Sequence, residues 1–254
     1  MTTTASIAVF FHNYYGDHAG WVERLCRNIP LPFDLYYNVV ENSIHNAGVT
    51  GAEILTEMNA AKSGNQLQKI YLRVSPNQGK DLGGKLVLLD SFMRSGQKIE
   101  WLLFLHDKQS PHKADPLTWK NRLYRILESD FIEKVMRLFE ADESVSVVAA
   151  EGSVAQEYDS CTASYKSSSA VLIKEMVQAY QMIGHNTGYV AGTMFWARAS
   201  AGSEFFKEYS PLSIRATLEK GNVMDDFDGT RTHAWERIIS WVFSGQGWKI
   251  KELA

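Results

Sequence analysis

The sequence predicts an α/β protein in which a mainly parallel central sheet is covered by helices on both faces, a three-layer sandwich. Short apolar runs of strand length alternate with segments of helix length along the chain, which is the pattern of βαβ units. Several of these runs are apolar at consecutive positions, as in parallel strands that are buried on both faces.

The expected elements follow from these runs in chain order. Strands are expected at residues 7–11, 33–40, 69–74, 101–105 and 145–150. Helices are expected at residues 22–29, 53–62, 85–93 and 119–141, and from 228 to about 243, while residues 189–196 mix strand and turn signals. Ligands of such sheets bind outside the carboxyl ends of the strands, so the residues that follow each strand are candidates for function.

Composition is that of an ordinary globular protein, with 45% hydrophobic and 22% charged residues. The 254 residues suit a single domain over 1–254, with a first half at about 1–150 and a second at about 151–254. The 26 basic and 29 acidic side chains give a net charge of −3, so no overall positive field recruits nucleic acid. Cys26 and Cys161 are too few and too far apart for a zinc site or disulfide framework, and both are interpreted as buried structural thiols.

No segment has the length of a membrane span. Residues 1–11 are apolar only briefly and lack a basic start, so they do not resemble a secretion signal. A helix that crosses a bilayer needs about 20 apolar residues. We therefore expect a cytoplasmic protein, and contact with the inner face of the membrane stays open.

Polar clusters follow the first and the third expected strands. His12 comes directly after the first strand, and Asn77, Gly79 and Asp81 lie in the turn before a glycine pair that ends at Gly84. A helix that begins after such a turn offers free amides and a positive dipole end to an anion. The alternative is a plain turn.

The segment after the fourth strand, His106-Asp107-Lys108-Gln109-Ser110, is difficult to explain by packing alone. An Asp that caps the next turn and a Lys in solvent form the alternative explanation. His106 and Asp107 could ligate a metal, but two neighbours on one strand end rarely complete a site.

Two further clusters lie in the second half. Thr193 and Trp196 belong to an aromatic strand end that either walls a pocket or lies in the core. After three carboxylates that end at Asp228, a helical spacing places three polar residues on one face, with apolar residues on the opposite, core-facing side. The polar residues are His233, Glu236 and Arg237, and the apolar ones are Trp235, Ile238, Ile239 and Val242. Asp228 is either functional or the cap of this helix.

These parts fit sugar transfer from a nucleotide diphosphate donor. The sequence patterns GxSxG, HExxH and GxGxxG do not occur, nor does the phosphate-binding pattern GxxxxGK followed by Ser or Thr, so the enzyme classes that carry them lack support. Sugar transfer needs cations or a helix N-terminus to stabilise the leaving diphosphate. It also needs a carboxylate to take the proton of the acceptor hydroxyl.

The motifs together resemble the rhamnan synthesis protein F family, bacterial glycosyltransferases of cell-wall and lipopolysaccharide polysaccharides. The resemblance covers about 7–243 and is carried by residues 77–81, 106–110, 192–196 and 228–237. It implies a GT-A-like, Rossmann-type fold with a nucleotide-sugar-binding half followed by an acceptor-binding half. The family's strand-end motif reads His-Thr-Lys-Lys-Ser, so His106, Lys108 and Ser110 match, whereas Asp107 and Gln109 depart from it.

The resemblance suggests a role for each candidate residue. The catalytic candidates are Asp228 as general base, Glu236 as its reserve, and His233. Thr193, Trp196 and Arg237 are candidates for the acceptor pocket. The donor-binding candidates are His12, Asn77, Gly79, Asp81, His106, Asp107, Lys108 and Ser110.

No metal ligand is assigned. In many GT-A enzymes an Asp-x-Asp at this strand end holds a divalent metal, whereas this chain has Lys108 in place of the second carboxylate. A charged Lys cannot ligate a metal but can neutralise a diphosphate directly. Mg²⁺ or Mn²⁺ is therefore not favoured as a cofactor.

The expected partners are a nucleotide-diphosphate sugar and a glycan or lipid-linked glycan acceptor. The donor sugar stays open: rhamnose is the guess at family level, and other hexoses or deoxyhexoses fit equally well. Two rival functions also stay open, a non-catalytic sugar-nucleotide or glycan-binding module of the same fold, and a phosphotransferase, which would need a firmer metal site.

Overall fold

The protein forms a seven-stranded sheet in the computed structural model, which describes residues 6–107, 115–182, 188–225, 229–245 and 247–254. The strand order within these ranges is β11-β5-β10-β4-β1-β2-β3. Every neighbouring pair is parallel except those of β10, which runs antiparallel to both β4 and β5. The strands are β1 (Ile7–Asn13), β2 (Phe33–Val40), β3 (Leu67–Ser75), β4 (Trp101–His106), β5 (Val145–Ala150), β10 (Phe195–Arg198) and β11 (Lys249–Leu253).

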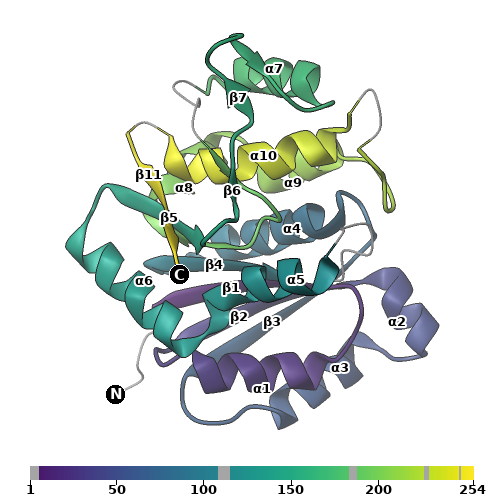
Figure 1. Ribbon diagram of the computed structural model, residues 1–254. Coiled ribbons are helices and arrows are strands. Elements are labelled where there is room, and N and C mark those ends of the chain that lie inside the picture. The colour runs from purple at the N-terminus through teal and green to yellow at the C-terminus, as the bar shows by residue number, and fades with distance from the viewer. Residues whose placement is uncertain (1–5, 108–114, 183–187, 226–228, 246) are drawn as a thin grey trace.

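Helices cover both faces of this sheet, which confirms the predicted three-layer α/β sandwich (Figure 1). One face carries α1 (His18–Asn28), α3 (Gly51–Ala60), α5 (Pro116–Tyr124), the 3₁₀ turn η1 (Arg125–Leu127) and α6 (Ser129–Ala141). The other carries α4 (Lys80–Ser95), α8 (Ala199–Glu208), α9 (Pro211–Ala216) and α10 (Arg231–Ser244).

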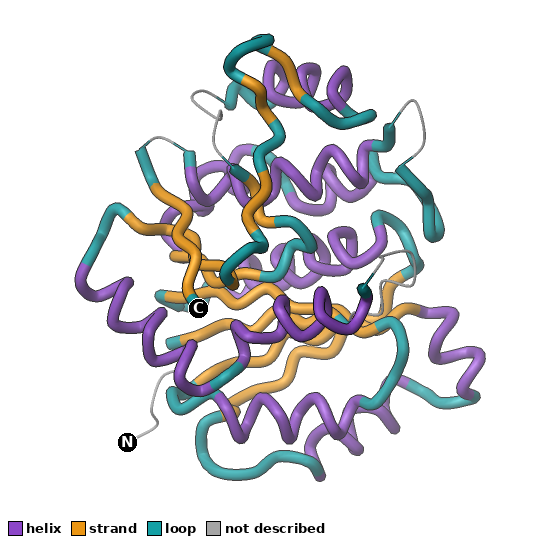
Figure 2. Tube along the Cα trace, viewed as in Figure 1, coloured by secondary structure: helices purple, strands orange, loops and turns teal. Residues whose placement is uncertain are grey.

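Smaller elements lie outside these layers. The short helix α2 (Glu41–Ala47) follows β2, and α7 (Ala170–Ala179) packs on α10, beyond the helical layer (Figure 2). Two short antiparallel pairs join β6 (Val154–Ala155) to β9 (Tyr189–Val190) and β7 (Tyr158–Asp159) to β8 (Ser164–Tyr165). Cys161, between β7 and β8, is exposed, so its interpretation as a buried thiol is wrong, whereas Cys26 of α1 is buried. No described helix is both long and apolar enough to cross a membrane.

Alternation along the central strands builds two cores from one apolar run. In β1, Ile7, Val9 and Phe11 pack toward α1 and α6, whereas Ala8 and Phe10 pack toward α4 and α10. Successive side chains of a strand point to opposite faces, so a strand covered on both faces must be apolar at every position. This requirement explains the unbroken apolar runs of the sequence.

Helix α4 begins at Lys80 rather than at residue 85. The expected start is wrong because Gly83 and Gly84, interpreted as part of a turn, lie within the helix. A Cβ at Gly83 would lie 1.7 Å from the carbonyl oxygen of Gln78, and one at Gly84 would lie 1.9 Å from His12 Nδ1. The glycines therefore permit close packing, which outweighs their low helix propensity.

The last long helix, α10, begins at Arg231. Its N-cap is Thr230, whose side chain accepts a hydrogen bond from the backbone amide of His233 at 3.1 Å. Thr230, and not Asp228, therefore occupies the N-cap position, and Asp228 lies outside the described residues. Trp235, Ile238, Ile239 and Val242 are buried as predicted.

Replacement of Gly84 by Ala tests the close approach of α4 to β1. The added methyl group would overlap the buried His12 ring, and overpacking of this kind costs about 1–3 kcal/mol. Gly51→Ala is the matched helical control, because its nearest neighbouring atoms would lie 3.7 Å away. Urea unfolding should show a loss of stability for Gly84→Ala and none for Gly51→Ala. Equal stabilities for the two variants would contradict the proposed packing.

Candidate functional site

The carboxyl ends of the parallel strands bring several polar side chains to one edge of the sheet. His12 of β1 pairs in register with Asn38 of β2 and with His106 of β4. Asn38 Nδ2 donates to His12 Nδ1 at 3.0 Å, and Ser75 Oγ donates to Asn38 Oδ1 at 3.0 Å. Burial lowers the pKa of His12 to about 4, so its ring is neutral at neutral pH.

A buried lysine lies at the centre of this edge. Lys85 projects from α4 with only 3% of its side chain exposed. Its Nζ lies 2.9 Å from His106 Nδ1, 2.8 Å from the carbonyl oxygen of Thr193 and 2.5 Å from Thr193 Oγ1. Asp81, one turn earlier on α4, pairs with the same ammonium at 3.2 Å. We call Asp81, Lys85, His106 and Thr193 the edge network.

Asp81 is the most exposed member of the edge network, with 26% of its side chain accessible to solvent, compared with 4% for His106. Its Oδ2 accepts a hydrogen bond from Thr193 Oγ1 at 2.6 Å. Asp81 is therefore the member of the edge network through which a ligand in solvent could contact it.

Asp107 is bound by the loop that follows β1. Its carboxylate accepts hydrogen bonds from the backbone amides of Tyr14, at 2.8 and 2.9 Å, and Tyr15, at 2.5 Å. Burial raises the pKa of Asp107 to about 6, although these backbone bonds act in the opposite direction. The structure thus gives Asp107 a clear role in holding this loop, and its expected donor contact stays a prediction.

The turn between β3 and α4 packs against residues 218–222. The Gly79 amide donates to the carbonyl oxygen of Glu219 at 2.8 Å, and Asn77 Nδ2 donates to Asn222 Oδ1 at 3.0 Å. A Cβ at Gly79 would lie 2.3 Å from Leu218, and φ is +76° there, so both space and conformation require glycine. Gly79 therefore serves chain packing in this structure.

A second polar cluster lies on α10. Arg237 pairs with Glu157 at 2.9 Å and with Asp225 at 3.2 Å. His233 lies between Thr230, at 2.6 Å from Nδ1, and the Lys80 ammonium, at 3.5 Å from Nε2. Burial lowers the pKa of His233 and the charge of Lys80 lowers it further, whereas Asp225 opposes them.

Glu236 connects the two clusters. Its Oε1 accepts a hydrogen bond from the backbone amide of Gly192 at 3.0 Å, and the next residue is Thr193 of the edge network. The Lys80–His233 contact joins the starts of α4 and α10. Residues from both halves of the chain therefore meet at one edge of the sheet.

The structure places the predicted site residues unequally. His12, Asp81, His106 and Thr193 come together at the sheet edge, and His233, Glu236 and Arg237 share one face of α10 as predicted. Lys108, Ser110 and Asp228 lie outside the described residues.

Trp196 requires a correction. It has no exposed surface, and its indole Nε1 donates to the carbonyl oxygen of Ile126 at 3.0 Å. It packs in the core on the α6 side of the sheet, so it does not wall a pocket. A strand with helices on both faces buries large side chains in either direction.

Sequence reasoning missed Lys85, Glu157 and Glu219. Glu219 accepts the first amides of α10, those of Arg231 at 2.7 Å and Thr232 at 2.9 Å. Only Lys85 had a visible signal, since it interrupts the apolar stripe Leu82, Leu86 and Leu89 of α4 and follows Asp81 by one turn. Glu157 and Glu219 find partners far away in the sequence, and no local pattern marks them.

The described residues at the end of β4, His106 and Asp107, do not fit a divalent metal. Asp107 is bound by backbone amides, and His106 Nδ1 contacts the ammonium of Lys85. Among the described residues, no group of three His, Cys, Asp or Glu side chains is arranged to hold a metal ion.

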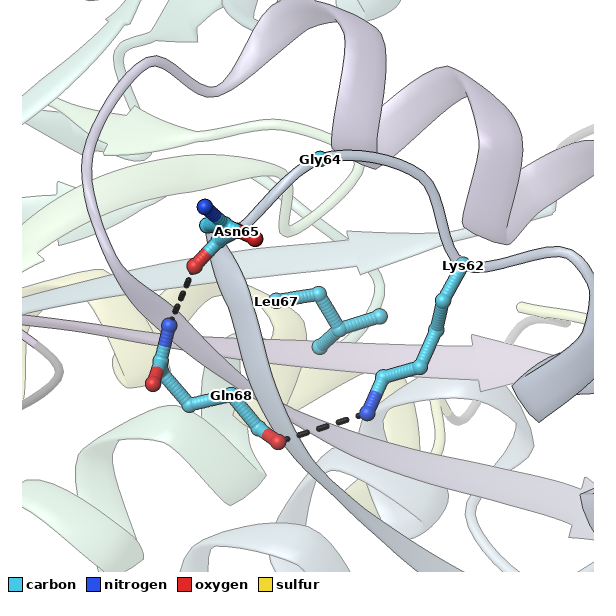
Figure 3. A pocket seen from close by; sticks show the side chains of 5 residues that line it. All are labelled: Lys62, Gly64, Asn65, Leu67 and Gln68. Carbon is cyan, nitrogen blue, oxygen red and sulfur yellow. Dashed lines mark hydrogen bonds between the residues drawn. The ribbon is translucent and has the colours of Figure 1, made fainter. Parts of the chain in front are cut away.

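A shallow hollow lies at the other end of the sheet, beside the start of β3 (Figure 3). Its polar groups contact one another, as in the bond from Lys62 Nζ to the carbonyl oxygen of Gln68 at 3.3 Å. The hollow is lined by Lys62, Gly64, Asn65, Leu67 and Gln68. It lies at the amino end of β3, away from the polar edge, so we do not assign it a ligand.

The fold and the edge network define an α/β protein with a polar site at the carboxyl ends of its parallel strands. The sequence profile of the family described as rhamnan synthesis protein F matches residues 1–247. The chain belongs to this family, which confirms the resemblance that its motifs indicated. No curated protein matches the chain.

The opposing titrations of His12 and Asp107 predict how stability depends on pH. The folded-state pKa of His12 is lowered from 6.5 to about 4. The contribution of the neutral ring to the free energy of unfolding is therefore fully present above about pH 6.5 and is lost as the pH falls toward 4. The folded-state pKa of Asp107 is raised from 3.8 to about 6. The contribution of its protonated carboxyl to the free energy of unfolding is therefore fully present below about pH 3.8 and is lost as the pH rises through 6. The two effects oppose each other between pH 4 and 6.

Asp107→Asn removes the titration of Asp107 and leaves that of His12. The free energy of unfolding of the variant should fall more steeply on acidification from pH 6 to 4.5 than that of the wild type, by about one proton or ~1.4 kcal/mol per pH unit. Urea unfolding across this range measures the slope. Glu204→Gln, at an exposed side chain, should keep the wild-type slope. The same slope in Asp107→Asn and wild type would show that Asp107 does not titrate in this window.

Proposed function

We propose that the protein is a glycosyltransferase with a GT-A-like fold that moves a sugar from a nucleotide-diphosphate donor to a growing bacterial surface polysaccharide. The observation that supports this most is the edge network at the carboxyl ends of β1 and β4, connected through Glu236 to the polar face of α10. Family membership supports a role in rhamnan synthesis, and rhamnose is the first donor sugar to test.

The donor would lie along the strand ends of the first half. Asp81 and His12 would face the nucleoside end, and His106 and Lys108 the diphosphate. A leaving diphosphate gains negative charge as the glycosidic bond breaks, so cations near it stabilise the transition state. Lys80 lies at the start of α4, where the helix dipole adds to its charge.

The acceptor would approach from the second half, over α10. In an inverting transfer a carboxylate takes the proton of the acceptor hydroxyl while its oxygen bonds to the anomeric carbon. The bond from that carbon to the diphosphate oxygen breaks, and the nucleoside diphosphate leaves with the electron pair. We propose Asp228 as this base, with Glu236 as reserve, since Glu236 already accepts the amide of Gly192.

His233 and Arg237 would position groups around this base. Arg237 contacts both Glu157 and Asp225, and His233 contacts Thr230, so α10 holds its polar face in one arrangement. Fixed geometry of this kind supplies part of the rate, because two large substrates must align. A lipid-linked acceptor would place the reaction at the cytoplasmic face of the membrane.

A non-catalytic glycan-binding or sugar-nucleotide-binding module is the second candidate, favoured by the departure at Asp107. A thermal-shift panel of nucleotide sugars, beginning with dTDP-rhamnose, tests donor binding, because a ligand stabilises the folded state according to its affinity. Release of nucleoside diphosphate with and without glycan acceptors then tests transfer. Binding of a nucleotide sugar without turnover on any acceptor would favour the module, and no binding of any nucleotide sugar or glycan acceptor would contradict both candidates.

Asp228→Asn should lower turnover by about 10²–10⁴-fold, because the variant lacks the base that takes the hydroxyl proton. The donor Kd should stay near that of the wild type, since the change lies in the acceptor half. Glu236→Gln is the comparison, measured by steady-state kinetics and calorimetry. Near-normal turnover in Asp228→Asn together with a large loss in Glu236→Gln would move the base to Glu236.

The transfer should not require a divalent metal. With Lys108 in place of a second carboxylate, the charge of a lysine would neutralise the diphosphate in place of a metal. Activity on the correct donor should therefore survive EDTA and change little on addition of Mn²⁺. Loss of activity in EDTA with recovery in Mn²⁺ would contradict this proposal.

A further inference from the structure

We propose that Lys85 is a positioning residue of the donor site, whose buried ammonium acts through Thr193 to fix the Asp81 carboxylate and the His106 ring. This inference rests on the proposed function for its effect on donor binding. The geometry of the network has a separate readout that needs no donor.

The N–H groups of the Lys85 ammonium face acceptors of the protein itself. A charged lysine has three N–H donors and no acceptor. Its three shortest contacts, to Thr193 Oγ1, the Thr193 carbonyl oxygen and His106 Nδ1, lie at 2.5 to 2.9 Å. Asp81 Oδ2 is more distant, at 3.2 Å. Lys85 therefore acts through its neighbours rather than as a direct ligand of the diphosphate.

The Thr193 hydroxyl links the Lys85 ammonium to Asp81 through two hydrogen bonds. Its oxygen accepts from Lys85 and its own proton is donated to Asp81 Oδ2 at 2.6 Å. Asp81 is thus held by a direct ion pair and by a hydrogen bond from a group that Lys85 itself polarises. Both contacts restrict the rotamer of the one network member with substantial exposure.

The lysine also fixes the tautomer of His106. Because the ammonium can only donate, Nδ1 must accept, and the proton of the neutral ring lies on Nε2. His106 Nδ1 lies 3.4 Å from Asp81 Oδ2. Without Lys85, Nδ1 could instead carry the proton and donate to Asp81. Removal of the lysine should therefore change which ring nitrogen is protonated.

The backbone at Thr193 gives independent support. Its φ is +53°, in the left-handed region that a β-branched residue rarely adopts. Lys85 binds both the carbonyl oxygen and the hydroxyl of this residue, and Glu236 binds the amide of Gly192 beside it. A strained conformation persists where its surroundings hold it from several sides, and Lys85 supplies two of these contacts.

Four variants separate positioning from simple structural support. Lys85→Met removes the charge with little change in volume, and Thr193→Val removes the hydroxyl with little change in shape. Thr193→Ser keeps the hydroxyl. Arg94→Met is the matched control, because Asp90 and Arg94 form the same i, i+4 acid–base pair on the same helix, with the arginine 74% exposed. Urea unfolding confirms that each variant is folded.

Two measurements are then made on the folded variants. Calorimetry with dTDP-rhamnose, and with UDP as a second probe, should show a donor Kd raised about tenfold or more in Lys85→Met and Thr193→Val. Thr193→Ser and Arg94→Met should stay within about twofold of the wild type. Imidazole ¹⁵N spectra should show His106 protonated on Nε2 in the wild type and in Arg94→Met, with a changed tautomer in Lys85→Met.

Wild-type donor binding together with an unchanged His106 tautomer in Lys85→Met would overturn the inference. If Lys85→Met does not fold, a wild-type Kd in Thr193→Val would overturn it equally. If the wild type binds neither nucleotide nor any member of the sugar panel, the proposed function fails, and the ¹⁵N spectra still decide whether Lys85 sets the state of His106.

Discussion

Burial of the Lys85 ammonium requires three separate elements to deliver acceptors to the same point. An unpaired charge inside a protein costs several kcal/mol, so Asp81 of α4, His106 of β4 and Thr193 before β10 must all be in place. This requirement fixes how α4 crosses the sheet edge and how the second half returns to it. The glycines of α4 belong to the same constraint, because Gly84 lets the helix approach the His12 ring.

The direction of β10 makes this arrangement possible in a mainly parallel sheet. Parallel strands place their carboxyl ends at one edge, where β1 ends near His12 and β4 near His106. A strand that runs the other way begins at that edge, so the residue pair before β10, Thr193 and Met194, arrives beside the end of β4. The one antiparallel strand of the described seven-stranded sheet thus carries the second half of the chain to the site of the first.

The layers of the fold and the buried faces of its elements can be predicted from the sequence, whereas contacts between residues that are distant along the chain cannot. Apolar runs predicted β1, β2, β4 and β5, since strands covered on both faces have little freedom in composition. The predicted start of α4 is wrong because glycine is required both in turns and where a helix closely approaches another element. Trp196 was assigned to the site or to the core with nothing to decide between them, because an aromatic strand end looks the same in either place. The acids Glu157, which is buried, and Glu219, which is partly buried, have partners 80 and 12 residues away, and no local pattern marks such pairs.

The contact between Glu236 and Gly192 couples the two halves of the site. Glu236 lies on the polar face of α10, which we assign to the acceptor, and its hydrogen bond to the Gly192 amide holds the residue before Thr193. Thr193 in turn holds Asp81, which we assign to the donor. A shift of α10 on acceptor binding would therefore act on the strained backbone at Thr193 and from there on Asp81. Because Lys85 binds Thr193 at two atoms, it would oppose such a shift, and in the proposed function the alignment of the two substrates would depend on a residue that touches neither of them.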